Sequence, residues 1–250
     1  MRVVRRLWKQ TRHRMSGAGP VRWFLNRGDR AVLYCLGDSH ARVFERVREA
    51  HLLDRTTLDV TWVLGATALG MANPNSRSNA LVDFRAALRG VPGQAPLVLL
   101  LGEIDCGYVL WYRAAHKGTD IREEFEQSLA NYTGFIEQLQ DAGHADVIVM
   151  TVPPPTIRDY ATWGGLDNAR RHVTASIEDR TRLTAEYNER LREWAGSHGA
   201  RVLDPEPDLM DSSSGLVRDA FVNEDPLNHH LHPQRFAEVV AARLRDLGYR

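Results

Sequence analysis

The feature that most constrains the fold is a repeated alternation of short apolar runs with longer amphipathic stretches. The apolar runs predict β-strands, and they lie at residues 31–36, 58–64, 96–101, 147–152 and 201–203. The amphipathic stretches predict helices, and they lie at about 41–53, 79–88, 121–142, 180–197 and 233–247. Strands that alternate with helices form βαβ units with right-handed crossovers. The sequence therefore predicts a single three-layer α/β/α domain built on a parallel sheet.

The predicted strands and helices also indicate how the chain is divided. We assign residues 31–250 to the α/β domain and residues 1–30 to a basic N-terminal extension. The stretch 153–179 has weak periodicity and mixed charge, so we interpret it as a lid-like insert over the sheet. The chain of 250 residues is long enough to bury a substantial core without disulfides or metals.

Composition excludes several classes of function. Lys+Arg and Asp+Glu each number 32, so no net charge points to a nucleic-acid partner. No stretch reaches the roughly 18 apolar residues of a membrane span, and the basic N-terminus has no apolar core behind it, which makes it a poor secretory signal. Cys35 and Cys106 both follow apolar runs and predict reduced, buried thiols. Together these features predict a cytoplasmic protein.

Three polar clusters follow predicted strands directly. They are Gly37-Asp38-Ser39-His40, Gly65-Ala66-Thr67 and Gly102-Glu103-Ile104-Asp105. Because sites in open parallel sheets form at the carboxyl ends of strands, we expect the three clusters to meet. Ser39 lies where the chain turns from strand into helix, and there a serine can serve as a nucleophile near backbone N–H groups or simply as a helix N-cap.

A histidine-rich segment before the last predicted helix supplies candidate bases. The segment is Asp225-Pro226-Leu227-Asn228-His229-His230-Leu231-His232-Pro233. A serine needs a base to become nucleophilic, and an acid can orient that base. Three histidines could also hold a metal, but His229 and His230 are adjacent and tend to point apart, and no helical carboxylate–histidine motif is present. We therefore expect no metal and no organic cofactor.

The order of these blocks resembles the SGNH/GDSL hydrolase superfamily, which implies a flavodoxin-like sheet and a serine nucleophile. Gly37-Asp38-Ser39 matches the nucleophile block, and Gly65 matches the glycine that supplies an oxyanion donor. The ending His230-Leu231-His232-Pro233-Gln234-Arg235-Phe236 is similar to the family's His-Leu-x-Pro-x-x-aromatic block. The resemblance implies that Ser39 is the nucleophile and that His230 is its base.

Two departures from the family pattern affect the expected site. Ile104 stands where the family has an oxyanion asparagine, although the Gly-Glu-Ile-Asp form resembles a bacterial subgroup with Gly-Asp-Ser-His. We assign Gly102, Glu103 and Asp105 to the oxyanion or substrate side of the site.

The second departure lies three residues before His230, where the family's acid is replaced by Leu227. Asp225 is the nearest acid and our candidate for orienting the base, with Asn228 and Glu224 as poorer substitutes. His232 remains an alternative base, because its place before a proline favours an extended backbone that could also reach the crevice.

These features predict an esterase that cleaves a small, acetyl-like acyl group through a Ser-His-Asp triad. The ester substrate is a small molecule or a carbohydrate. Two alternatives stay open: acyl transfer to an acceptor other than water by the same residues, and a binding or scaffold protein whose site has eroded. Ile104 and Leu227 favour erosion, whereas Ser39 with a terminal histidine favours activity.

Overall fold

The computed structural model describes residues 30–158, 173–225 and 228–250. Its strands form one parallel five-stranded sheet with the order β2-β1-β3-β4-β5. The strands are β1 (Ala31–Gly37), β2 (Thr56–Trp62), β3 (Leu97–Leu100), β4 (Val147–Met150) and β5 (Arg201–Leu203). The predicted parallel α/β sheet is confirmed, and its strand order is that of flavodoxin-like folds.

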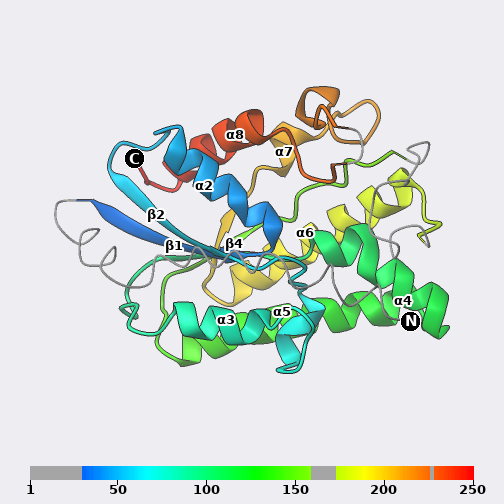
Figure 1. Cartoon of the computed structure of the whole chain (residues 1–250), viewed down its shortest axis with the longest axis horizontal. Helices are drawn as coiled ribbons and strands as arrows, with labels where there is room; N and C mark the ends of the chain where they lie inside the picture. The colour runs from blue at the N-terminus through cyan, green and yellow to red at the C-terminus, as the bar shows by residue number, and fades with distance from the viewer. Residues whose placement is uncertain (1–29, 159–172, 226–227) are drawn as a thin grey trace, which may run out of the picture.

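Helices cover both faces of the sheet (Figure 1). They are α2 (Arg42–Glu49), α3 (Ala80–Ala87), α4 (Leu110–Lys117), α5 (Ile121–Asp141), α6 (Ile177–Ser197), α7 (Glu206–Leu209) and α8 (Pro233–Asp246). Helices α2 and α8 pack on one face, and α3 and α5 lie on the other. The arrangement gives the three layers that the sequence predicts.

The central strands are buried on both faces, which explains their unbroken apolar sequences. In β1, Leu33 and Cys35 join the core under α2 and α8, whereas Tyr34 and Leu36 join the core under α3, α5 and α6. Side chains of a strand alternate between faces, so only a strand covered twice needs apolar residues at every position. Cys35 and Cys106 are both buried free thiols, as expected.

The sheet reverses its direction of growth at β1, and this places the site. The chain moves from β1 outward to β2 and then returns to the other side of β1 as β3. Gly37 lies at the end of β1, where an added Cβ would sit 2.4 Å from the carbonyl oxygen of Leu100. Only glycine lets β1 and β3 approach this closely at the reversal, which is where open sheets bind ligands.

The loop after β4 is fixed by a buried side chain rather than by a neighbouring strand. Asn188 of α6 is fully buried, and its amide pairs with both backbone groups of Val152. The amide oxygen accepts from the Val152 N–H at 2.7 Å, and the amide nitrogen donates to the Val152 carbonyl at 3.0 Å. This pairing holds the segment that follows β4 next to the carboxyl end of the sheet.

Sequence reasoning missed two helices and placed other boundaries within a few residues. Helix α4 follows a π-helical turn, Asp105–Val109, in a segment without clean periodicity, and α7 is a single short turn. Of the predicted insert 153–179, residues 159–172 lie outside the described residues, as does nearly all of the predicted extension 1–30. Within the described part of the chain, no helix is both long and apolar enough to cross a bilayer.

Candidate active site

Ser39 lies in the turn between β1 and α2, in the short 3-10 helix η2 (Ser39–Ala41). Asp38 caps this turn, because its carboxylate accepts from the His40 N–H at 2.7 Å. The Asp38 N–H in turn donates to the carbonyl of Leu100 in β3. The serine is therefore held by a tight turn that is bonded to the neighbouring strand, and its side chain lies at the carboxyl edge of the sheet.

His230 meets Ser39 from the opposite end of the sequence. The Nε2 atom of His230 lies 2.9 Å from the Oγ atom of Ser39, across 191 positions of the chain. This distance is within the hydrogen-bonding reach that a general base needs. The structure thus brings together the two residues that the sequence singled out.

Asn228 faces the other nitrogen of the same imidazole. Its Oδ1 atom lies 2.9 Å from Nδ1 of His230 and also accepts the backbone N–H of His230 at 3.0 Å. Asn228 is itself held by its own N–H, which donates to the Asp225 carbonyl. A short side chain that accepts a backbone N–H two residues ahead is a common turn motif. On sequence alone, Asn228 ranks below Asp225 as the residue that orients His230. Asn228 reaches the imidazole because this turn places a side chain next to the residue two positions ahead.

His232, the alternative base, has a structural place instead. It is the N-cap of α8, and its Nδ1 atom accepts the backbone N–H of Arg235 at 3.4 Å. Its own backbone N–H donates to the carbonyl of Phe221. These bonds fix the start of α8, which positions the loop that carries His230.

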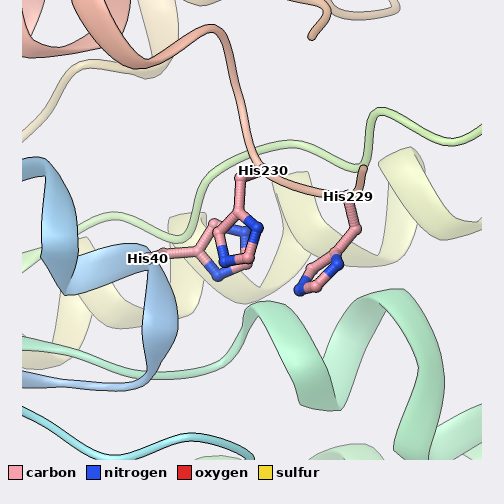
Figure 2. A group of neighbouring side chains, drawn as sticks. All are labelled: His40, His229 and His230. Atoms are coloured by element: carbon pink, nitrogen blue, oxygen red, sulfur yellow. The ribbon is translucent and has the colours of Figure 1, made fainter. Parts of the chain in front are cut away.

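Three histidine rings gather at the site, as Figure 2 shows. The ring of His229 lies 4.1 Å from that of His230 and 5.4 Å from that of His40, measured between centroids. Our expectation that His229 points away from His230 is therefore wrong, because the loop bends between the two residues. The three side chains offer nitrogens within 4.8 Å of one another.

The hydrogen bonds of these rings favour proton chemistry over metal ligation. Both nitrogens of His230 face oxygen atoms, those of Ser39 and Asn228. The Nδ1 atom of His40 faces Asp38 Oδ1 at 3.1 Å. A metal ion would need the lone pairs that these contacts engage, so we assign hydrogen-bonding roles to His40 and His230.

His40 is a buried cation between two carboxylates. Its Nδ1 atom lies 3.1 Å from Asp38 Oδ1 and 3.6 Å from Glu103 Oε2. Burial by itself lowers the pKa of His40, but the charges of Glu103 and Asp38 outweigh burial and raise the pKa from 6.5 to about 9. At neutral pH the ring therefore carries a positive charge beside the Ser39–His230 pair.

Asp105 anchors the loop after β2. Its carboxylate is fully buried and accepts the N–H groups of Ala68 and Leu69 at 2.8 and 2.9 Å. The Ser128 hydroxyl donates to it at 3.0 Å. Burial raises the pKa of Asp105 to about 6. Our assignment of Asp105 to the oxyanion or substrate side stays a prediction, and in the structure its carboxylate holds the loop that carries Gly65.

The two glycines assigned to the site have different environments. Gly65 is exposed, with a φ of +73°, and has open space around the position of a Cβ. Gly102 is buried, with a φ of +121°, and an added Cβ would lie 2.8 Å from a methyl group of Val152. Both positions need glycine for their backbone conformation, and Gly102 also needs it for space.

A family model identifies the chain. The model of the SGNH domain that is fused to AT3 domains matches residues 10–229. The chain belongs to this SGNH domain family. The SGNH/GDSL resemblance drawn from the sequence is thereby confirmed, and the protein is a serine hydrolase of the SGNH type.

Solved structures show the same fold at low sequence identity. A GDSL-like lipase from Bacteroides thetaiotaomicron has a TM-score of 0.56 and 14% identity, and the match covers 86% of this chain and 86% of the lipase. A member of the lipolytic G-D-S-L family from Veillonella parvula has a TM-score of 0.52 and 15% identity, covering 87% of this chain and 97% of its own. A carbohydrate acetylesterase from Sinorhizobium meliloti has a TM-score of 0.50 and 13% identity, covering 87% of this chain and 100% of its own. No curated protein matches the chain.

The third block of this SGNH domain departs from the family in a way that the structure explains. Ile104 is buried and directly precedes the π-helical turn Asp105–Val109. Its side chain has no hydrogen-bond donor. The same block instead supplies Glu103 to His40 and Asp105 to the Gly65 loop. Sequence reasoning missed both partnerships, although the carboxylates at strand ends were visible in the sequence.

Proposed function

We propose that this SGNH domain cleaves esters of small acyl groups, with Ser39 as nucleophile and His230 as general base. The observation that carries the proposal is the 2.9 Å distance between Ser39 Oγ and His230 Nε2. A neutral imidazole at this distance can take the hydroxyl proton as the oxygen attacks the ester carbonyl. The proposal also assigns to Asn228 the orienting role that the sequence gave to Asp225.

The reaction divides into two steps. In the first, the proton of Ser39 moves to Nε2 of His230, Oγ bonds to the acyl carbon, and the alcohol leaves with the proton from His230. In the second, His230 takes a proton from water as the water oxygen bonds to the acyl carbon, and it then gives that proton to Oγ of Ser39 as the bond between Oγ and the acyl carbon breaks and the acid leaves. Asn228 Oδ1 accepts a hydrogen bond from the Nδ1–H of His230 in both steps, which keeps Nε2 directed at Ser39.

Backbone N–H groups are the donors that we propose for the oxyanion. The candidates are the N–H of Ser39 and the N–H of Gly65, because Ile104 offers no side-chain donor. Asp105 supports this role indirectly, since it holds the loop just after Gly65 by two backbone N–H groups. A hole that lacks one side-chain donor is expected to cost about 10²–10³ in rate relative to a complete one.

The substrate that we propose is an acetyl-like ester on a carbohydrate. A small pocket that His229 lines contains carboxylate, hydroxyl, guanidinium and imidazole groups, which are polar enough to contact a hydroxyl group of a ligand. Its lining residues are Glu103, Gly107, Tyr108, Pro155, Thr156, Ile157, Val173, Arg180 and His229. The structurally similar Sinorhizobium meliloti protein is named a carbohydrate acetylesterase, and we extend that substrate class to this chain.

Acyl transfer to an alcohol is the second candidate function, because an acceptor hydroxyl could take the place of water in the second step. Kinetics with and without an added sugar or alcohol separate the two. A hydrolase releases one acid for each alcohol at every acceptor concentration. A transferase forms a new ester and releases less free acid as the acceptor increases.

Hydrolysis of p-nitrophenyl acetate tests the proposed function. We expect the purified chain to turn over this ester and the Ser39→Ala variant to lose the activity, because no other group replaces the nucleophile. Ser197→Ala is the matched control, since Ser197 is exposed at the end of α6. Equal turnover by Ser39→Ala and the wild type would move the chemistry away from Ser39, and an inactive wild type would favour the eroded binding protein.

A further inference from the structure

His40 directly follows the nucleophile and is almost fully buried, with 3% of its surface exposed. The mechanism above does not use it. Its ring lies 4.5 Å from the ring of His230, measured between centroids and tilted by 33° (Figure 2). A titratable group this close to the general base changes the charge that the base experiences.

The partners of His40 come from three separate segments. Asp38 belongs to the nucleophile turn, Glu103 follows β3, and the His229 carbonyl belongs to the terminal loop. All three partners are acceptors. A ring that faces acceptors is best paired when both nitrogens carry protons, because a neutral imidazole has a single N–H. His40 thus joins the terminal loop to the two other blocks of the site.

Both carboxylates lie within ion-pair distance of this ring. Asp38 Oδ2 and Glu103 Oε2 are buried and have no hydrogen-bond partner among the described residues. Burial of a carboxylate without a counter-charge is costly. The titratable and charged groups around the His40–His230 pair are Asp38, Glu103 and His229, and the buried guanidinium of Arg180 lines the same pocket as Glu103 and His229.

We propose that His40 is a permanent imidazolium that offsets Asp38 and Glu103 and so keeps His230 neutral and able to accept the Ser39 proton. This inference rests on the proposed function, because it takes His230 as the base. Without the cation, two buried carboxylates would stabilise a protonated His230, which cannot act as a base. His40 is a positioning residue in this account: it touches no substrate, and it acts through the charge and placement of His230.

The pH dependence of kcat/KM separates this role from simple packing. In His40→Gln the charge is lost and a side-chain donor is kept. We expect the acidic limb of the profile to move upward by about one pH unit, the lower end of the effect of a charge at 4–6 Å. The double variant His40→Gln/Glu103→Gln also lacks one of the two carboxylates. We expect the acidic limb of its kcat/KM profile to return toward the wild-type pH.

His198→Gln is the matched control, since it makes the same change at an exposed histidine at the end of α6, outside the site. Its acidic limb is expected to stay at the wild-type pH. An unmoved limb in His40→Gln would overturn the proposal, and so would a shift that the Glu103→Gln change does not reverse. A purely structural role predicts lower activity with an unmoved limb.

A second measurement is independent of activity and of the variants. In the full wild-type chain labelled with ¹⁵N-histidine, we expect NMR to show the His40 ring doubly protonated at pH 7.5, with its titration near pH 9. A neutral His40 ring at pH 7.5 would overturn the proposal whether or not the chain hydrolyses esters. A charged ring in a chain without esterase activity would instead count against the proposed function alone.

Discussion

At the scale of single residues, the site depends on which oxygen faces Nδ1 of His230. The amide oxygen of Asn228 occupies this position at 2.9 Å. An amide carries no charge, so it orients the imidazole but stabilises the imidazolium less than a carboxylate does. The proposed base is therefore oriented by a neutral amide where a Ser-His-Asp triad has a carboxylate.

Substitution of Asn228 tests this assignment. We expect Asn228→Ala to lower kcat by about 10- to 100-fold. A positioned general base raises the rate by about 10²–10⁴-fold, and the loss of its orienting residue removes a part of that gain. Asn228→Asp should retain activity, because it keeps an oxygen at the same place. Asp225→Ala is the comparison, and ester hydrolysis is the measurement. A larger loss in Asp225→Ala than in Asn228→Ala would return the orienting role to Asp225.

The charge of His40 also predicts how stability changes with pH. The pKa of His40 is about 9 in the folded protein, against an ordinary value of 6.5. Because the folded protein binds this proton more tightly than the unfolded chain does, the proton adds to the free energy of unfolding. The added free energy is fully present below pH 6.5 and is lost as the pH rises through 9. Its size is on the order of 3 kcal/mol.

Denaturant unfolding of the wild type and of His40→Gln at several pH values measures this contribution. The difference in unfolding free energy between the two proteins should shrink from pH 6.5 to pH 9. The buried thiols of Cys35 and Cys106 titrate in both proteins, so their effect cancels in the difference. A difference that stays constant across this range would show that His40 is not charged in the folded protein.

At the scale of elements, the loop after β2 is held by a side chain from the block after β3. Asp105 accepts two backbone N–H groups of this loop and the hydroxyl of Ser128 from α5. This contact links the β2 end, the β3 end and a helix on one face of the sheet. The loop that carries Gly65 thus owes its position to a residue about 40 positions away.

Removal of the Asp105 carboxylate is expected to loosen this loop. Asp105→Ala leaves buried donors without acceptors, which costs on the order of 3 kcal/mol in unfolding free energy. It should also lower kcat/KM, because Gly65 is a proposed oxyanion donor. Asp54→Ala is the control at an exposed aspartate, where the expected change is within about 0.5 kcal/mol. Equal stability of the two variants would contradict the anchoring role.

The elements themselves were largely predictable from the sequence, for a physical reason. Strands buried on both faces, such as Leu97–Leu100, are continuously apolar, and long helices such as Ile121–Asp141 show a clear period. The segment that forms α4 was missed because its first turn is π-helical and breaks the period. A pattern based on regular spacing cannot find an element that begins irregularly.

The site was predictable only in part. Ser39 and His230 were singled out correctly as a pair that meets, since each lies in a recognisable block next to a strand or helix end. The partner of His230 was ranked below Asp225, because a side chain that accepts an N–H two positions ahead, as Asn228 does, leaves no periodic signal. The burial that gives His40 and Asp105 their roles depends on three segments packing together, which spacing along the chain does not show.

At the scale of the whole molecule, the fold brings the two ends of the domain together over one edge of the sheet. The turn after β1 and the loop before α8 are separated by nearly the full described chain, yet they form the Ser39–His230 contact. The packing of α2 against α8 on one face supports this closure. The central claim of the account is that this contact makes Ser39 a nucleophile.

Labelling with a fluorophosphonate tests that claim most directly, because the probe phosphonylates an activated serine without any need to know the substrate. We expect intact mass spectrometry to show one label per chain and peptide mapping to place it on Ser39. The Ser39→Ala variant should take up no label, and His230→Ala should react about 10²–10⁴ times more slowly. Label on another residue, or equal labelling of the wild type and Ser39→Ala, would contradict the account.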